Sequence, residues 1–148
     1  MPTVDAAPAR RWMAMTALAL AGFADALYLT GYHYNPAVRA CVGSGGCEAV
    51  NGSRFATLAG VPVALIGTAG YVLILAALTA RRWGPPHGRR AAGYAAYVLA
   101  AAGTAFSLYL TALEAFVLHA YCTWCLFSAA VITAVCVVAT IDLAAGSP

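Results

Sequence analysis

Four of the five cysteines in this 148-residue chain fall into two pairs that could form and exchange disulfides. Cys122 and Cys125 stand three positions apart in Cys-Thr-Trp-Cys, directly before a long apolar run. If a helix begins there, the two sulfurs can meet across one turn, and the helix N-terminus favours a thiolate. Cys41 and Cys47 lie six positions apart in a glycine-rich segment. The spacing therefore predicts two dithiols that are suited to thiol–disulfide exchange.

Two other uses of these thiols stay open at this point. Two cysteine pairs could hold a tetrahedral zinc ion, although Cys41 and Cys47 are further apart than ligand pairs usually are and no histidine stands in a ligand-like motif. We therefore expect no bound metal. The pairs could also be inert structural disulfides, but these need no Cys-x-x-Cys at a helix start. The fifth cysteine, Cys136, lies inside an apolar run, where we expect it to pack as a small apolar residue.

The composition excludes a water-soluble globule. The chain is 63% hydrophobic and only 9% charged, whereas soluble domains carry about 25% charged residues. Its length fits one domain. Lysine is absent and the arginines form short pairs without interleaved aromatic residues, so we expect no nucleic-acid partner. Lipid must therefore solvate much of the surface.

Four apolar runs are long enough to cross a bilayer as helices, at about residues 13–32, 57–80, 91–113 and 122–141. We expect no strands, because only helices or closed barrels satisfy the backbone in lipid. The first run exceeds the core of a cleaved signal peptide, which is about 7–15 residues long. Short connections at 81–90 and 114–121 make neighbouring spans antiparallel. The sequence thus predicts an all-α membrane protein: one four-helix domain over residues 1–148, with an outer loop over 31–54.

The arginines predict the orientation of these spans. Only Arg39 and Arg54 lie on the side of the 31–54 loop, and six arginines lie on the other side: Arg10, Arg11, Arg81, Arg82, Arg89 and Arg90. We expect the protein in the inner membrane of the cell. The positive-inside rule then places both termini in the cytoplasm. Both cysteine pairs face the extracytoplasmic side, where disulfides form and persist. A dithiol next to the acyl chains could pass electrons to a lipid-soluble acceptor.

Three longer stretches resemble the bacterial homologues of vitamin K epoxide reductase: LYLTGYHY, CVGSGGCEAVNGSRFATLAGVPVALIGTAGY and FSLYLTALEAFVLHAYCTWCLFSA. They cover most of the chain between residues 27 and 130. The ordered set is more specific than a lone Cys-x-x-Cys, because it joins a loop pair, a Gly-x-Pro before a span and Tyr-Cys-x-Trp-Cys before the last span. A short repeat, Leu-Tyr-Leu-Thr at 27–30 and 108–111, precedes each cysteine pair by fourteen residues.

The resemblance implies a four-helix bundle around a quinone, either ubiquinone or menaquinone, and a quinone-dependent thiol–disulfide oxidoreductase. In that family the residue matching Cys125 faces the quinone, and the residue matching Cys122 exchanges with the loop. Cys47 matches the loop cysteine that attacks the Cys122 bond, and Cys41 matches the one that meets the protein partner. We expect no fused thioredoxin-like domain, so the electron donor is a separate extracytoplasmic thioredoxin-like protein. Vitamin K or its epoxide is a further candidate substrate.

Three more residues are candidates for contact with the substrate. Ser53 matches a family serine or threonine near the active site, but it could simply cap the second span. Trp124 could pack on the quinone or anchor the chain at the membrane interface. Asp25 departs from the family pattern, and an ionisable residue within a span is either functional or reaches the interface. We expect Glu114 to cap the end of the third span at the surface.

Overall fold

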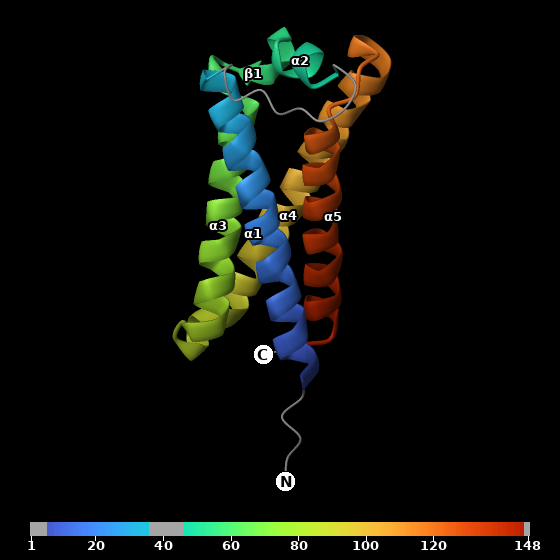
Figure 1. Cartoon of the computed structure of the whole chain (residues 1–148). Coiled ribbons are helices and arrows are strands. Elements are labelled where there is room, and N and C mark those ends of the chain that lie inside the picture. Colours follow the sequence, from blue (N-terminus) through green and yellow to red (C-terminus); the bar gives the residue numbers. More distant parts are fainter. Residues whose placement is uncertain (1–5, 36–45, 147–148) are drawn as a thin grey trace.

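The computed structural model describes residues 6–35 and 46–146, which form a bundle of long helices (Figure 1). Four helices span most of this chain: α1 (Ala6–Tyr34), α3 (Val63–Trp83), α4 (Pro86–Leu113) and α5 (Thr123–Ala144). Each is long and apolar enough to cross a membrane. The predicted fold class, an all-α membrane bundle, is therefore confirmed.

The second span begins later than the sequence indicated. Residues 46–62 form α2 (Gly46–Asn51), a 3-10 turn η1 (Arg54–Ala56), and the antiparallel strands β1 (Thr57–Leu58) and β2 (Val61–Pro62). The expected start at residue 57 is wrong, as is the expectation of no strands. Ala59 and Gly60 take positive φ values of 52° and 82°, which turns the chain back on itself. Pro62 cannot continue a helix ladder, and α3 starts directly after it.

The other connections are shorter than expected. Only Gly84 and Pro85 separate α3 from α4. Pro86 starts α4, where the missing backbone N–H of proline costs no hydrogen bond, because the first N–H groups of a helix have no partner within it. The predicted 81–90 turn is therefore mostly helical. At its other end α4 continues as the π-helical turn η2 (Glu114–Leu118), which ends at His119 with a φ of 50°. The predicted 114–121 connection is thus helical over its first half.

The helices pack as a ring in which α1 and α4 each contact both α3 and α5. Small residues allow this close packing, and several are fully buried: Ala19, Ala26, Ala96 and Ala100. Gly22 is a point of close approach, since a Cβ there would overlap the ring of Tyr71. The Tyr71 side chain on α3 is consequently held against α1.

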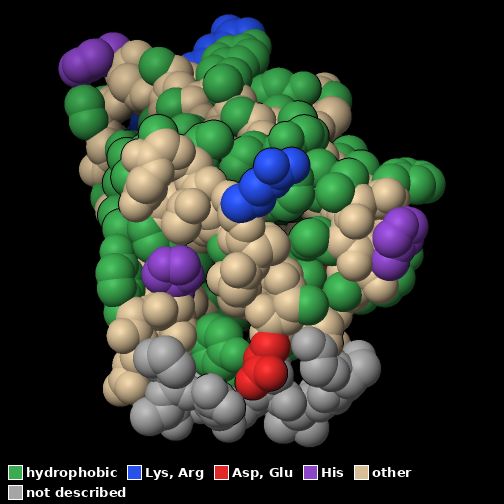
Figure 2. Space-filling model, turned by 90° about the horizontal axis from the view of Figure 1, so that it is seen from above, with side chains coloured by type: hydrophobic (Ala, Val, Ile, Leu, Met, Phe, Trp, Pro, Cys, Tyr) green, Lys and Arg blue, Asp and Glu red, His purple; other side chains and the backbone are tan. Residues whose placement is uncertain are grey.

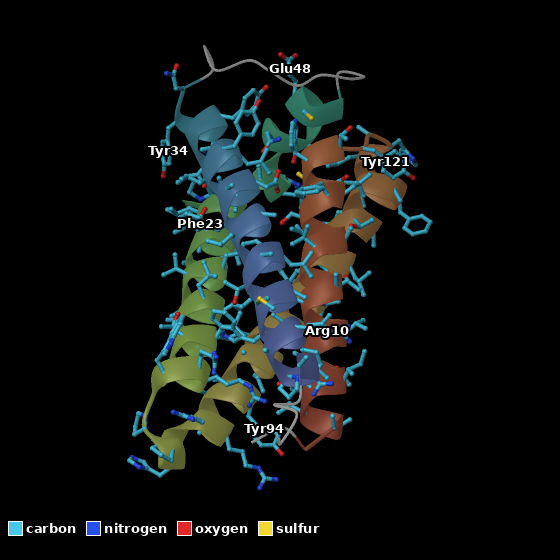
Figure 3. All side chains as sticks on the ribbon, turned by 60° about the horizontal axis from the view of Figure 1, so that its bottom comes forward. Arg10, Phe23, Tyr34, Glu48, Tyr94 and Tyr121 are labelled. Atoms are coloured by element: carbon cyan, nitrogen blue, oxygen red, sulfur yellow. The ribbon has the colours of Figure 1, made fainter. Side chains whose placement is uncertain are left out.

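The outer faces of the helices are apolar. Large side chains point outward with about half or more of their area exposed, among them Leu20, Leu73, Val98, Leu108 and Val137. The two ends differ: Arg10 and Tyr94 lie at one end, and Tyr34, Glu48 and Tyr121 lie at the other, next to α2 (Figure 3). We call the second end the thiol end, because Cys47, Cys122 and Cys125 lie there, and the first end the arginine end.

A buried ion cluster closes the arginine end. Asp142 of α5 accepts a hydrogen bond from Nε of Arg11 on α1 at 3.0 Å and also pairs with Nη2 of Arg81 on α3. Asp142 and Arg81 are 4% and 9% exposed. Trp12 adds a bond from its indole N–H to the Leu78 carbonyl at 3.0 Å. These contacts tie three helices together.

Candidate active site

Cys122 and Cys125 lie at the first turn of α5, as predicted. Cys122 is the N-cap residue, and its Sγ accepts the backbone N–H of Cys125 at 3.3 Å. Both thiols are free. Cys122 directly precedes the span and is fully buried. The hydrogen bond from the Cys125 thiol, joined by backbone N–H groups of Cys125 and Trp124, lowers the pKa of the Cys122 thiol in spite of its burial.

The short helix α2 brings Cys47 to the same end of the bundle. Cys47 is 3% exposed and takes part in a disulfide. Cys41 lies outside the described residues, so the structure does not test its predicted role. Gly46 packs against the backbone of Tyr121, where a Cβ would overlap the Tyr121 carbonyl oxygen. Glycine at this position therefore lets α2 approach the residue next to Cys122.

Asn51 links the two sulfur sites. Its Nδ2 donates to the Cys47 carbonyl at 3.0 Å and lies 3.9 Å from the Sγ of Cys122. Sequence reasoning missed this residue, because nothing in a polar Asn-Gly-Ser segment indicates which neighbour an amide will meet. Figure 2 looks down on the thiol end and shows few charged side chains among hydrophobic ones on its visible surface.

Below α2 and η1 the helices enclose a cavity of about 360 Å³. Its wall is mainly apolar and includes Leu29, Ile66, Ile74, Phe106 and Leu110. A few polar side chains join them: Asn51, Ser53, Tyr71, Glu114, Cys125 and Ser128. Size and lining are typical of a site for a small, mostly apolar molecule. Cys125 contributes to this wall, whereas Cys122 does not.

Glu114 is buried in this wall, not at the surface. It is 3% exposed, and its Oε2 accepts the backbone N–H of Cys122 at 3.1 Å. Glu114 is the C-cap residue of α4, as expected, but the expected surface position is wrong because η2 carries the chain a further turn beyond Glu114. One signal could have found it: a carboxylate eight residues before Cys122, between apolar residues on both sides.

Asp25 is also buried and does not reach the interface. It is 5% exposed, and within the described part of the chain neither carboxyl oxygen has a hydrogen-bond partner. It interacts electrostatically with Tyr71 and Cys125, both of which line the cavity, although Asp25 itself does not. The Tyr71 hydroxyl shares a hydrogen bond with Ser128 Oγ at 3.1 Å. The alternative that Asp25 reaches the interface is therefore wrong, and a functional role for Asp25 stays a prediction.

Ser53 and Trp124 occupy different surroundings. Ser53 lines the cavity and donates from Oγ to the Val50 carbonyl at 2.7 Å. It stands well before α3 and makes no side-chain cap, so the simple capping alternative is wrong. Trp124 packs on Tyr28, with ring centroids 5.5 Å apart, and is not part of the cavity wall. Cys136 packs against the core as expected.

Among residues 6–35 and 46–146, no cluster of three or more histidine, cysteine, aspartate or glutamate side chains is placed to hold a metal ion. A site built from all four thiols would also require Cys41. With the geometry established, comparison with known families gives one match: a model described as the vitamin K epoxide reductase family matches residues 13–140. The match covers α3 and α4 in full, most of α1 and α5, and both described cysteine sites.

Proposed function

Since the chain belongs to the vitamin K epoxide reductase family and is a membrane thiol oxidoreductase, we propose that it is a quinone-linked thiol oxidase. It takes electrons from a separate extracytoplasmic thioredoxin-like protein and passes them to ubiquinone or menaquinone. In this proposal the thiol end faces the extracytoplasmic side and both termini are cytoplasmic. The position of Arg10 at the opposite end from Glu48 supports this orientation (Figure 3).

One observation carries the proposal: the two thiols of one Cys-x-x-Cys face different neighbours. Cys125 lines the apolar cavity, whereas Cys122 lies beside Asn51, which also binds the Cys47 carbonyl. A relay needs this division, because one sulfur must exchange with the loop while the other meets the final acceptor. An inert disulfide would need neither the cavity nor the loop contact.

The cavity suits a quinone ring. Its apolar walls can hold the ring and exclude water. The hydroxyls of Ser53 and Tyr71 and the amide of Asn51 can donate to carbonyl oxygens once they turn from the protein groups that they bond in the structure. A bound quinone would supply a two-electron, two-proton acceptor. Trp124 is not in the wall, so in this proposal it steadies α5 against α1 through Tyr28.

Electron transfer between the cysteine pairs balances as two thiol–disulfide exchanges. The partner's dithiol first reduces the Cys41–Cys47 bond. The Cys47 thiolate then attacks the Cys122–Cys125 disulfide at Cys122, so that a Cys47–Cys122 bond forms and Cys125 leaves as thiolate. Cys41 next attacks Cys47 and releases Cys122, whose lowered pKa makes it a good leaving group. The Cys122–Cys125 dithiol finally gives up two electrons and two protons and becomes a disulfide again.

The test is quinone reduction by the purified protein with a reduced dithiol donor. Cys125→Ala should lower turnover by at least about 1,000-fold, because the sulfur that faces the cavity is removed. Cys136→Ala, which changes a core-packing thiol on the same helix, is the matched control and should turn over normally. Unchanged turnover in Cys125→Ala would refute the proposed function. The same assay with vitamin K epoxide as acceptor tests that further substrate.

A further inference from the structure

Asp25 is a buried acid for which the described part of the chain supplies no counter-charge. It lies in α1, nine residues before the helix ends, and is 5% exposed. Neither oxygen has a hydrogen-bond partner, and no ion pair to it is found over residues 6–35 and 46–146. An ionised carboxylate in such a place costs several kcal/mol, whereas a protonated one is far cheaper to bury. These surroundings favour a carboxyl group that keeps its proton.

The neighbours of Asp25 lead to the cavity. The titratable groups that face it are Tyr71 of α3 and Cys125 of α5, and both line the cavity. Glu114, from η2, interacts with the same Cys125 thiol. Gly22, three residues before Asp25, has no side chain to keep the Tyr71 ring away from α1. The Tyr71 hydroxyl shares a hydrogen bond with Ser128 Oγ at 3.1 Å, and Ser128 also lines the cavity.

We propose that Asp25 stores a proton and delivers it to the cavity through the Tyr71 hydroxyl when the Cys122–Cys125 dithiol is oxidised. This inference rests on the proposed function. The Asp25 carboxyl, which has no hydrogen-bond partner among the described residues, turns to Tyr71 Oη and gives it a proton as Tyr71 passes its own proton into the cavity. This supplies one of the two protons that the acceptor takes up, and the Cys122 thiol supplies the other. The Cys125 thiol, on losing its proton to become part of the disulfide, restores the proton on Asp25. Both electrons come from the two sulfurs, and Asp25 ends each cycle as it began.

The first test needs no quinone and no turnover. Infrared spectra of the purified, reduced protein should contain the carbonyl stretch of a protonated carboxylic acid, and Asp25→Asn should remove one such component. Glu48→Gln is the control, because Glu48 is exposed on α2, away from Asp25, and its substitution should leave these bands unchanged. Glu114→Gln identifies any separate contribution from Glu114. Identical carboxyl bands in the wild-type protein and Asp25→Asn would overturn the proposal.

The second test separates proton delivery from thiol exchange. Asp25→Asn should slow quinone reduction by about 100-fold and flatten its pH dependence. Tyr71→Phe, which keeps the ring, should have a similar effect. In both variants, exchange between the dithiol donor and the loop disulfide, measured without quinone, should keep its wild-type rate. Wild-type quinone reduction in Asp25→Asn would refute the role of Asp25. Absence of quinone reduction in the wild-type protein would refute the proposed function itself, whatever the infrared result.

Discussion

Two buried aspartates, one at each end of the bundle, have opposite surroundings. Asp142 at the arginine end is 4% exposed and bonded to Arg11 and Arg81. Asp25, toward the thiol end, is 5% exposed and has no hydrogen-bond partner in the described chain. The gap beside Asp142 has no room for a water-sized molecule, whereas the cavity near Asp25 measures about 360 Å³.

The contrast separates stability from chemistry within one small bundle. At the arginine end, Asp142 is paired with Arg11 and Arg81, and these pairs fasten α1, α3 and α5. At the thiol end, acids, thiols and hydroxyls surround a cavity and keep some of their bonding capacity free for a ligand or a proton. Proteins commonly accept unsatisfied groups where function requires them and compensate elsewhere. Three predictions test this division.

The largest expected effect is on stability. Asp142→Asn should lower the free energy of unfolding by about 3–5 kcal/mol, because two arginines lose the carboxylate that compensates their burial. Asp25→Asn should leave it almost unchanged, since an unpaired acid is replaced by a neutral group of the same shape. Denaturant-induced unfolding in detergent micelles measures both. Equal losses in the two variants would contradict the division between the ends.

A smaller effect is expected on the rate at which Cys47, carried by α2, forms a disulfide with Cys122. Gly46→Leu should slow formation of the Cys47–Cys122 bond by about 10-fold or more, because overpacking against the Tyr121 backbone costs about 1–3 kcal/mol. Gly31→Leu is the control, as a side chain there would meet nothing within 4 Å. Quenched-flow trapping of the mixed disulfide gives the rates. If both variants exchange at the wild-type rate, the contact between α2 and Tyr121 does not govern the relay.

The smallest effect concerns the charge at Cys122. Its thiolate should appear at lower pH than that of an ordinary thiol, because hydrogen bonds to the sulfur lower its pKa. The carboxylate of Glu114 opposes this shift, so Glu114→Gln should lower the pKa of the Cys122 thiol further. Thiolate absorbance in a Cys41→Ser, Cys47→Ser, Cys125→Ser, Cys136→Ala background isolates Cys122, because the loop disulfide that Cys122 would otherwise attack is absent. Glu48→Gln, on the outer side of α2 (Figure 3), should change nothing. An upward shift in Glu114→Gln would contradict the assigned electrostatics.

The sequence was sufficient for the bundle and for the helix-start cysteines, because long apolar runs and cysteine spacing are local signals. It was insufficient for the start of the second span. Leu58 and Val61 extend the apolar run, and hydropathy alone cannot distinguish their hairpin from a helix, although Ala59-Gly60 and Pro62 did carry a turn signal.

The surroundings of Asn51, Glu114 and Asp25 depend on tertiary contacts. Asn51 meets Cys122 from 71 residues away, and the lack of partners for Asp25 emerges only when α1, α3 and α5 are packed together. The sequence pattern can mark such residues as unusual in an apolar segment. It cannot show whether a neighbouring helix supplies a hydrogen-bond partner for them.

The most direct test of the account is a disulfide map of the Cys125→Ala protein, obtained by peptide mass spectrometry after rapid alkylation. With its resolving partner removed, Cys122 should attack the loop disulfide and remain bonded to Cys47. A dominant Cys47–Cys122 bridge is the predicted result. A free Cys122 beside an intact loop disulfide, under conditions in which the wild-type protein exchanges, would contradict the relay on which the proposed function depends.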